Sequence, residues 1–453
     1  WDLINIKSLA KINFPISLIL IVAVLLRFFN LGGLPGSVFD EVYYPVFALK
    51  LLSGQEYFSV HPPIGVYLTS LSIYLHSILP WTDPLLASGF DINNLDPISY
   101  RWLPAFIGVM LVYVSYLLSL QVSDKKYFAL LVALFFCLDG SMLVDSRFGL
   151  INIYLVFFGF LGLLFLFRAI KSPENLLETF LSAIFVGLAL SVKWNGLGFW
   201  ALSLCVLFFI AITNRFEIKI HHKWYVKNTL LCRSFFVVTA VPILIYLISW
   251  APYFYIYEHK SFLDTHNQLL SFHSDSVDPK SHPYESKWYT WPFAQRPMGY
   301  FFEAIGEGDN TDFTSVHLFP NPMLYWFGLA AVLTLSGKFL MATRSFLFTR
   351  TADLTYFFMF FVVFGYFGNL LPWSLVSRST FLYHYQPSSG FAFLALAFFV
   401  SSLLENNKSQ NRLFASIIIT LILAATIYWL PLQLGISVNK DYFYQLMWFD
   451  SWI

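Results

Sequence analysis

The sequence predicts an all-α polytopic membrane protein with about eleven transmembrane helices in a single domain. Of its 453 residues, 58% are hydrophobic and only 12% are charged, whereas a soluble domain carries about 25% charged residues. Stretches such as Trp102–Val122 and Phe235–Ala251 contain no charge and are long enough to cross a hydrocarbon core of about 30 Å. The net charge of +1 offers no basic field for nucleic acid.

The apolar segments and their charged borders give the expected spans. The break at Lys193-Trp194-Asn195 fits either a turn between two short spans or a kink in one long span. We expect the spans at 14–29, 102–122, 127–144, 151–167, 179–192, 196–213, 234–250, 321–337, 354–371, 384–404 and 413–431.

The distribution of Lys and Arg predicts the orientation. With the N-terminus in the cytoplasm, 16 of the 27 basic residues, beginning with Lys7 and Lys11, fall on short cytoplasmic segments. Residues 30–101 and 251–320 are then the two long external segments. The apolar stretch Ile64–Leu79 in the first of them is short and carries His76, which predicts an interfacial helix rather than a span.

An adjacent pair of carboxylates, Asp40 and Glu41, follows the first predicted span, and His61-Pro62-Pro63 comes soon after. A solvated loop would also accept such a pair. A carboxylate here could instead take the proton from an attacking hydroxyl. Two neighbouring side chains point apart, so we expect one to act in chemistry and the other to orient or bind.

Cations recur at the same external face of the predicted bundle. They are Arg147, Lys193 and Arg378, with His384 close to the last. Arg147 could simply reach the interface, and Tyr383 and Tyr385 fit an aromatic belt. Lys193, however, is the only charge between Glu178 and Arg215, and an intramembrane charge usually marks function. Such a cluster suits an amphiphile with a phosphate head group.

Six motifs in order resemble the protein O-mannosyltransferase family, in its bacterial form. They are "FDEVYY…HPPIG", "YRWLPAFIGV", "DSRFGLINIYLVFF", "GLALSVKWNGL", "HPYESKWYTWPFAQRPM" and "FLYHYQPSSGFAFLALA". The segment 251–320 is too short for the soluble MIR domain of eukaryotic members. Asn152 stands where the family usually has Asp.

The resemblance implies a GT-C fold and inverting transfer of mannose from a polyprenyl-phosphate donor to Ser or Thr of exported proteins at the outer face of a bacterial inner membrane. It implies Asp40 as the base with Glu41 beside it. The expected donor-binding residues are His61, Arg101, Arg147, Lys193, Trp194, Arg378 and His384, and the expected substrate-loop residues are Lys287, Trp288 and Arg296.

Two other interpretations of the function remain open at this point. One is an enzyme of the same fold that transfers a lipid-linked sugar to lipid A or another envelope glycan. The other is a transporter or membrane scaffold, which would favour internal repeats and helices broken at the midplane. The transfer scheme requires no cofactor, and a metal held by Asp40 and Glu41 would lack an obvious third ligand.

Overall fold

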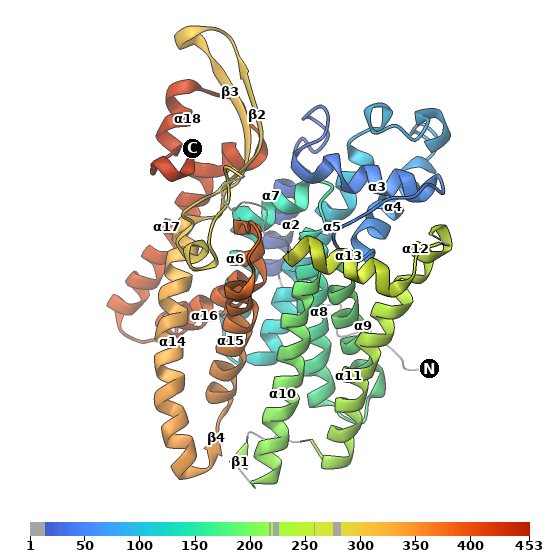
Figure 1. Cartoon of the computed structure of the whole chain (residues 1–453). Helices are drawn as coiled ribbons and strands as arrows, with labels where there is room; N and C mark the ends of the chain where they lie inside the picture. The colour runs from blue at the N-terminus through green and yellow to red at the C-terminus, as the bar shows by residue number, and fades with distance from the viewer. Residues whose placement is uncertain (1–13, 217–218, 221–225, 258, 275–281) are drawn as a thin grey trace.

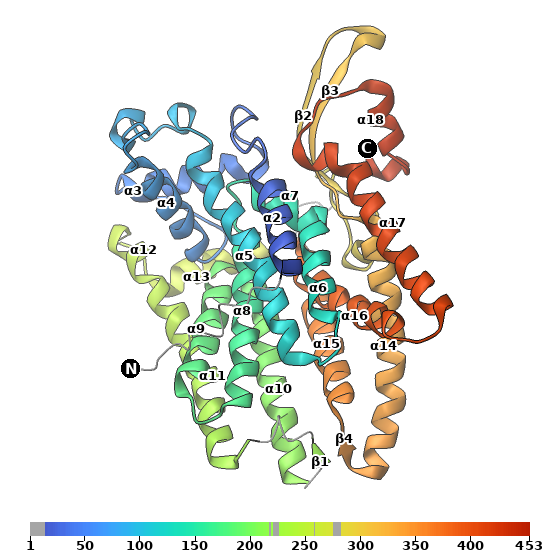
Figure 2. The same cartoon turned by 180° about the vertical axis from the view of Figure 1, so that it is seen from behind.

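The structure, a computed structural model, is a helical bundle with a smaller layer of helices and strands at one end (Figures 1 and 2). It describes residues 14–216, 219–220, 226–257, 259–274 and 282–453. Lys7, Lys11 and Lys223, which entered the charge count, lie outside the described residues.

Within the described residues, eight helical segments are long and apolar enough to cross a membrane. The pair α6 and α7 adds a bent span, and α2 and α9 are shorter apolar helices. Each of the eleven expected ranges falls on one of these elements. Their bounds are α2 Phe14–Phe28, α5 Ile98–Val122, α6 Phe128–Leu138, α7 Gly140–Arg147, α8 Asn152–Lys171, α9 Leu176–Val192, η4 Trp194–Gly196 with α10 Leu197–Arg215, α11 Asn228–Ser249 with α12 Ala251–Ile256, α14 Pro322–Thr349, α15 Leu354–Leu370 with η8 Leu371–Leu375, η9 Leu382–Tyr385 with α16 Gln386–Leu404, and α17 Ser409–Leu434.

Polar side chains at the helix starts explain several of these boundaries. The side chains of Asn175, Asn321 and Asp353 accept hydrogen bonds from backbone N–H groups in the first turns of α9, α14 and α15. Such caps satisfy donors that the helix itself leaves unpaired. Pro322 follows the Asn321 cap at the first position of α14, where its missing N–H costs nothing.

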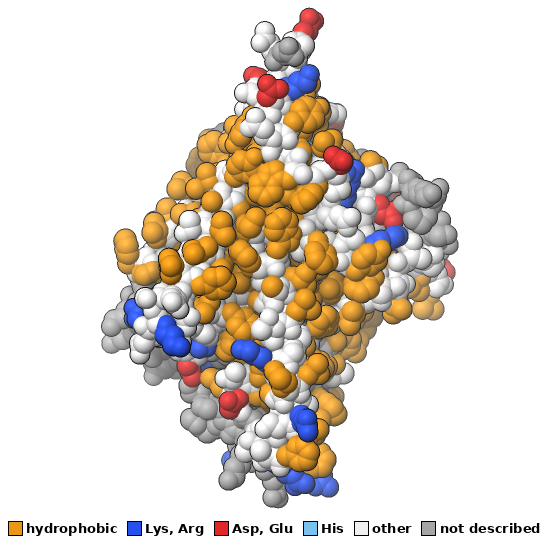
Figure 3. Space-filling model, turned by 90° about the vertical axis from the view of Figure 1, so that its left-hand side faces the viewer, with side chains coloured by type: hydrophobic (Ala, Val, Ile, Leu, Met, Phe, Trp, Pro, Cys, Tyr) orange, Lys and Arg blue, Asp and Glu red, His pale blue; other side chains and the backbone are white. Residues whose placement is uncertain are grey.

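The loops that should be cytoplasmic gather at one end of the bundle. Strand β1 (Lys219–Ile220) pairs with β4 (Thr351–Ala352), and the Glu405 carboxylate accepts a 2.7 Å hydrogen bond from the Lys126 N–H. On the face drawn in Figure 3, hydrophobic side chains cover a broad middle band, with charged groups above and below it. This distribution fits a protein that spans a membrane several times.

The opposite end carries the shorter elements. They are α3 (Tyr44–Leu52), α4 (Ile64–Ser77), α13 (Phe262–Ser274), α18 (Lys440–Leu446), and an antiparallel sheet in the order β2 (Met298–Ile305), β3 (Asp312–Leu318), β5 (Val438–Asn439). Helix α4 covers most of the expected interfacial range 64–79 and packs on α3 and α5. Its 14 residues span only about 21 Å.

A sharp bend between α6 and α7 brings polar residues to this end. The two helix axes differ by 56°, and the Asp139 carboxylate at the bend accepts a 3.0 Å hydrogen bond from the Met142 N–H in the first turn of α7. Every residue of α7 is buried. The bend therefore holds Asp145 in the interior rather than at the lipid surface.

A buried ion pair fixes the loop between α2 and α3. The Arg101 guanidinium, on α5, donates to both oxygens of Glu41 at 2.9 and 2.7 Å. It also donates to the backbone carbonyls of Leu31, Leu34 and Gly36. Both side chains are fully buried. Because every guanidinium N–H has an acceptor, this pair avoids the cost of an unsatisfied buried charge.

The same carboxylate organises the start of η1 (Phe39–Val42). Its oxygens accept hydrogen bonds from the N–H groups of Val38 at 2.8 Å and Gly149 at 2.7 Å. Gly149 lies between α7 and α8, so Glu41 ties three parts of the chain together. Asp40, its neighbour, is held in place by this arrangement.

We predict that Arg101→Met destabilises the protein strongly, because it leaves Glu41 as a buried charge without its partner. The expected loss is about 3–5 kcal/mol, read from unfolding of the detergent-solubilised protein. The matched control is Arg168→Met, since the Arg168 pair with Glu178 is partly exposed and should contribute only about 0–1 kcal/mol. Equal losses in the two variants would contradict the structural role of the buried pair.

Candidate active site

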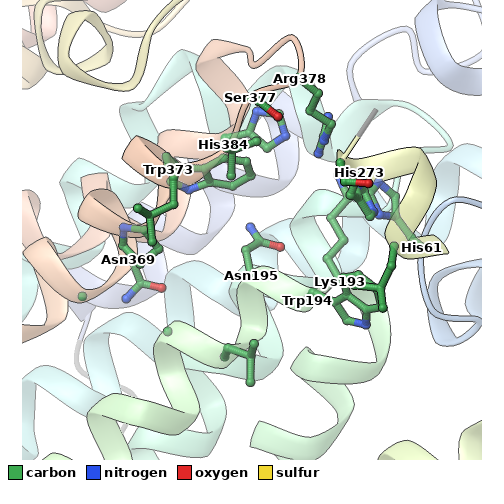
Figure 4. A pocket seen from close by; sticks show the side chains of 18 residues that line it. His61, Lys193, Trp194, Asn195, His273, Asn369, Trp373, Ser377, Arg378 and His384 are labelled. Carbon is green, nitrogen blue, oxygen red and sulfur yellow. The ribbon is translucent and has the colours of Figure 1, made fainter. Parts of the chain in front are cut away.

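A pocket of about 520 Å³ opens at the end of the bundle that carries the short elements. Figure 4 shows its polar lining, which comes from the segment between α3 and α4, the α9–η4 junction, α13, the end of α15, and the segment from η8 to η9. The labelled side chains are His61, Lys193, Trp194, Asn195, His273, Asn369, Trp373, Ser377, Arg378 and His384. Most of the other lining residues are leucine, proline and valine, so the pocket has an apolar part and a polar part.

Lys193 is the buried cation of this pocket. It ends α9 in an extended backbone conformation, with φ −151° and ψ 147°, which starts the turn before η4. Its ammonium donates a hydrogen bond to the Asn152 side-chain oxygen and lies 5.0 Å from the centre of the Tyr383 ring. The break at Lys193 is thus a turn between α9 and α10 whose side chain faces into the site.

Arg378 supplies a second positive charge from the segment between η8 and η9. It lies on the same side of the pocket as His273, and the Lys193 side chain extends toward both (Figure 4). One Arg378 Nη1 hydrogen bond goes to the Ser379 carbonyl at 3.2 Å. Lys and Arg converging from different elements are suited to an anionic group such as a phosphate.

The histidines beside these cations are neutral. Burial, reinforced by the charges of Lys193 and Arg378, lowers the pKa of His61 well below its ordinary value. Burial also lowers the pKa of His273 to about 4, and the nearby Arg378 charge adds to this effect. The two rings stack with centres 5.8 Å apart. The positive charge that the pocket offers to a ligand therefore comes from Lys193 and Arg378.

Asp40 is half-buried on η1, close enough to Lys193 and Asp145 for their charges to act on it. Burial raises the pKa of Asp40 to about 6, against the opposing effect of Lys193 and with a further contribution from Asp145. A carboxylate with this pKa is ionised at neutral pH and accepts a proton readily.

Asp145 lies at the centre of a hydrogen-bond network beneath Asp40. Its oxygens accept from the Tyr300 hydroxyl at 3.0 Å and the Gln386 amide at 3.0 Å, and also from the Asn152 side chain. Asn152 accepts in turn from Lys193. An amide can donate to one partner and accept from another at once, so Asn152 links Asp145 to the cation.

Three of the expected site residues have protein partners in this structure. Arg101 uses all its donors on Glu41 and three carbonyls, so none is left for a phosphate. Arg147 points at the end of α2 and donates to the carbonyls of Leu26 and Arg27. Glu41 is fully buried in its pair with Arg101, an arrangement that positions the loop.

The expected substrate-loop residues lie away from this pocket. Lys287 and Arg296 line a separate cavity of about 390 Å³. Lys287 pairs with Glu285 at 2.9 Å, and Arg296 donates to the carbonyls of Pro283, Ser451 and Ile453. Trp288 packs edge-on against Tyr289. In this structure Arg296 joins the segment before β2 to the chain after α18.

Several lining residues carried no distinctive sequence signal. His273 is an isolated histidine in a polar segment, and Asn195, Asn369 and Trp373 are single residues in or beside apolar helices. Their spacing along the chain matches no recognisable ligand pattern. Only the tertiary fold brings them beside Lys193.

Models of two families match consecutive halves of the chain. Residues 17–258 match the dolichyl-phosphate-mannose-protein mannosyltransferase family. Residues 258–452 match the C-terminal four-transmembrane region of protein O-mannosyltransferases.

Curated relatives match over nearly their whole length. The polyprenol-phosphate-mannose–protein mannosyltransferase of Corynebacterium glutamicum is 23% identical, over 96% of this chain and 92% of the relative. The protein of that name from Mycobacterium tuberculosis is 22% identical, over 96% and 91%.

Solved structures show the same fold at lower identity. The Saccharomyces cerevisiae protein O-mannosyltransferase Pmt1–Pmt2 complex bound to its sugar donor matches with a TM-score of 0.78 and 14% identity, covering 100% of this chain and 93% of that one. The Archaeoglobus fulgidus oligosaccharyltransferase matches with a TM-score of 0.57 and 15% identity, covering 97% and 58%. The fold is that of the GT-C membrane glycosyltransferases. This multi-pass membrane protein is thus a glycosyltransferase that belongs to the dolichyl-phosphate-mannose-protein mannosyltransferase family.

Proposed function

We propose that this enzyme transfers mannose from a polyprenyl-phosphate donor to Ser or Thr hydroxyls of exported proteins at the outer face of a bacterial inner membrane. The observation that carries the proposal is that Asp40, a carboxylate ionised at neutral pH, lies within electrostatic reach of Lys193, which lines the pocket together with Arg378. The names of the bacterial relatives support this donor and acceptor.

The proposed reaction is a direct displacement. The acceptor oxygen attacks the anomeric carbon of mannose while Asp40 takes the hydroxyl proton. The bond between that carbon and the phosphate oxygen breaks, its electrons leave with the lipid phosphate, and the anomeric configuration inverts.

Lys193 and Arg378 would stabilise the phosphate as its negative charge increases. Positioned charges in a site that excludes water contribute much more than the same charges in water. The leaving group is already an anion, so it needs no acid and no metal ion in this scheme. Glu41 is occupied by Arg101 and two backbone N–H groups, which argues against an Asp40–Glu41 metal site.

The direct test is Asp40→Asn, assayed with polyprenyl-phosphate-mannose and an acceptor peptide in buffer containing EDTA. We expect transfer to fall by at least about a hundredfold, because a general base contributes about 10²–10⁴. The wild-type rate should also fall as the pH drops below about 6, where Asp40 gains its proton.

The Asp40→Asn variant should fold, because the pKa of Asp40 is raised in the folded protein. A raised pKa in the folded state means that ionised Asp40 costs stability as the pH rises through about 6. Asparagine removes that cost, so Asp40→Asn should be at least as stable as wild type at pH 7. Wild-type turnover by the folded variant would refute Asp40 as the base. Transfer to lipid A but not to peptide would refute the proposed acceptor.

Lys193→Ala should weaken use of the lipid-phosphate donor. A hydrogen bond to a charged group contributes about 1.5–3 kcal/mol, which is roughly a ten- to hundredfold change in donor KM or kcat/KM. The control is Lys440→Ala, at the start of α18 on the same end of the molecule, which should leave the donor KM unchanged. If both variants behave like wild type, Lys193 has no role in donor binding.

Single cysteines test the proposed orientation in a background without Cys137, Cys205 and Cys232. Three exposed residues suit this test: Ala87 in η2 (Leu85–Ser88) after α4, Glu307 between β2 and β3, and Ser409 at the start of α17, in a loop that the charge distribution predicts to be cytoplasmic. In cells whose outer membrane has been made permeable, we expect an inner-membrane-impermeant maleimide to label Ala87→Cys and Glu307→Cys. Ser409→Cys should react only after lysis. The reverse pattern would place the site in the cytoplasm.

A further inference from the structure

Phe39, the residue before Asp40, has an unusual backbone. Its φ is +52°, in the left-handed region that bulky residues avoid, at a cost of about 1–3 kcal/mol. Such strain persists only where the surroundings impose it. At Phe39 the neighbouring N–H of Val38 is fixed by Glu41, and the ring is held from the other side.

The ring of Tyr300 provides that second contact. It lies parallel to the Phe39 ring, with the centres 4.2 Å apart and 7° between the planes. An aromatic pair contributes about 0.5–1.5 kcal/mol beyond its buried area, which offsets part of the strain. Tyr300 is itself buried, so this stack belongs to the interior.

A β-bulge directs Tyr300 toward this position. In the pairing of β2 with β3, Gly299 faces His317 and Phe301 faces Val316, which leaves Tyr300 without a partner across the ladder. Bulges turn a side chain out of the regular alternation and are common beside active sites. The bulged residue therefore brings the β2–β3 hairpin into contact with the loop that carries Asp40.

The hydroxyl of Tyr300 makes a second connection. It donates to Asp145 at 3.0 Å, and Asp145 is linked through Asn152 to Lys193. One side chain thus contacts the strained residue beside the base through its ring, and the network behind the donor-side cation through its hydroxyl.

We infer that Tyr300 is a positioning residue for the transfer reaction, with its ring placing Asp40 through Phe39 and its hydroxyl placing Lys193 through Asp145 and Asn152. The inference rests on the proposed function, because it takes Asp40 as the base and Lys193 as the donor contact. Loss of the ring contact should therefore lower kcat, whereas loss of the hydroxyl should raise the donor KM.

Two variants distinguish the role of the Tyr300 ring from that of its hydroxyl. Tyr300→Leu removes the stack, and we expect kcat to fall on the order of ten- to a hundredfold, as for a base misplaced by about 1 Å. Tyr300→Phe keeps the stack and should restore kcat to within about threefold of wild type. It lacks the hydrogen bond to Asp145, so the donor KM should rise about three- to tenfold.

A double-mutant cycle tests whether the ring acts through Phe39. Phe39→Leu should lower kcat as Tyr300→Leu does, and the double variant should lose little more than either single variant, because both remove the same contact. The control is Tyr444→Leu on α18, a tyrosine that is about half exposed at the same end of the molecule, which should leave both constants unchanged.

Wild-type kcat in folded Tyr300→Leu, or additive losses in the double variant, would overturn the role of the ring. An unchanged donor KM in Tyr300→Phe would overturn the role of the hydroxyl. If Tyr300→Leu does not fold, Phe39→Leu and Tyr300→Phe still decide the two roles. Full turnover by Asp40→Asn would instead refute the proposed function, and that result is distinguishable from every outcome at Tyr300.

Discussion

The buried ion pair between Glu41 and Arg101 is the contact on which the rest of the site depends. It joins the loop after α2 to α5, and through Gly149 to the α7–α8 connection. A buried pair of this kind is no gain in stability over apolar packing, but losing one partner is costly. Its effect here is geometric, because it fixes the residues on either side of Asp40. Asp40 can then remain partly exposed, whereas its neighbour Glu41 is fully buried in the ion pair.

The pocket combines charged side chains with neutral polar side chains. Lys193 and Arg378 give the pocket its positive charge, whereas His61 and His273 stay neutral beside them. A neutral imidazole can hydrogen bond to a sugar or phosphate without adding to the repulsion between the two cations. Asp145 and Asn152 place a carboxyl group and an amide behind Lys193, which limits the cost of burying its ammonium. An anionic ligand bound in the pocket would offset the remaining positive charge of Lys193 and Arg378.

Much of the fold could be predicted from sequence, because apolar length and charge asymmetry follow directly from the membrane. Lys193 was also predictable, since a lone charge between apolar segments is costly. Arg101 and Glu41 were not separable from ligand-binding residues, because a cation near the membrane surface looks the same whether its partner is a phosphate or a carboxylate 60 residues away. Tyr300 could not be found at all, since its direction depends on a bulge in a sheet whose register the sequence does not reveal.

In the proposed reaction, Lys193 and Arg378 hold the lipid phosphate while Asp40 lies beside the reacting carbon. The most direct measurement is an electron cryomicroscopy structure of the wild-type enzyme in a lipid nanodisc with a polyprenyl-phosphate sugar that cannot be transferred. We predict phosphate oxygens about 2.7–2.9 Å from the Lys193 ammonium and the Arg378 guanidinium, with the anomeric carbon on the side of the pocket that faces Asp40. A phosphate bound elsewhere, with Lys193 still engaged only by Asn152, would contradict the account.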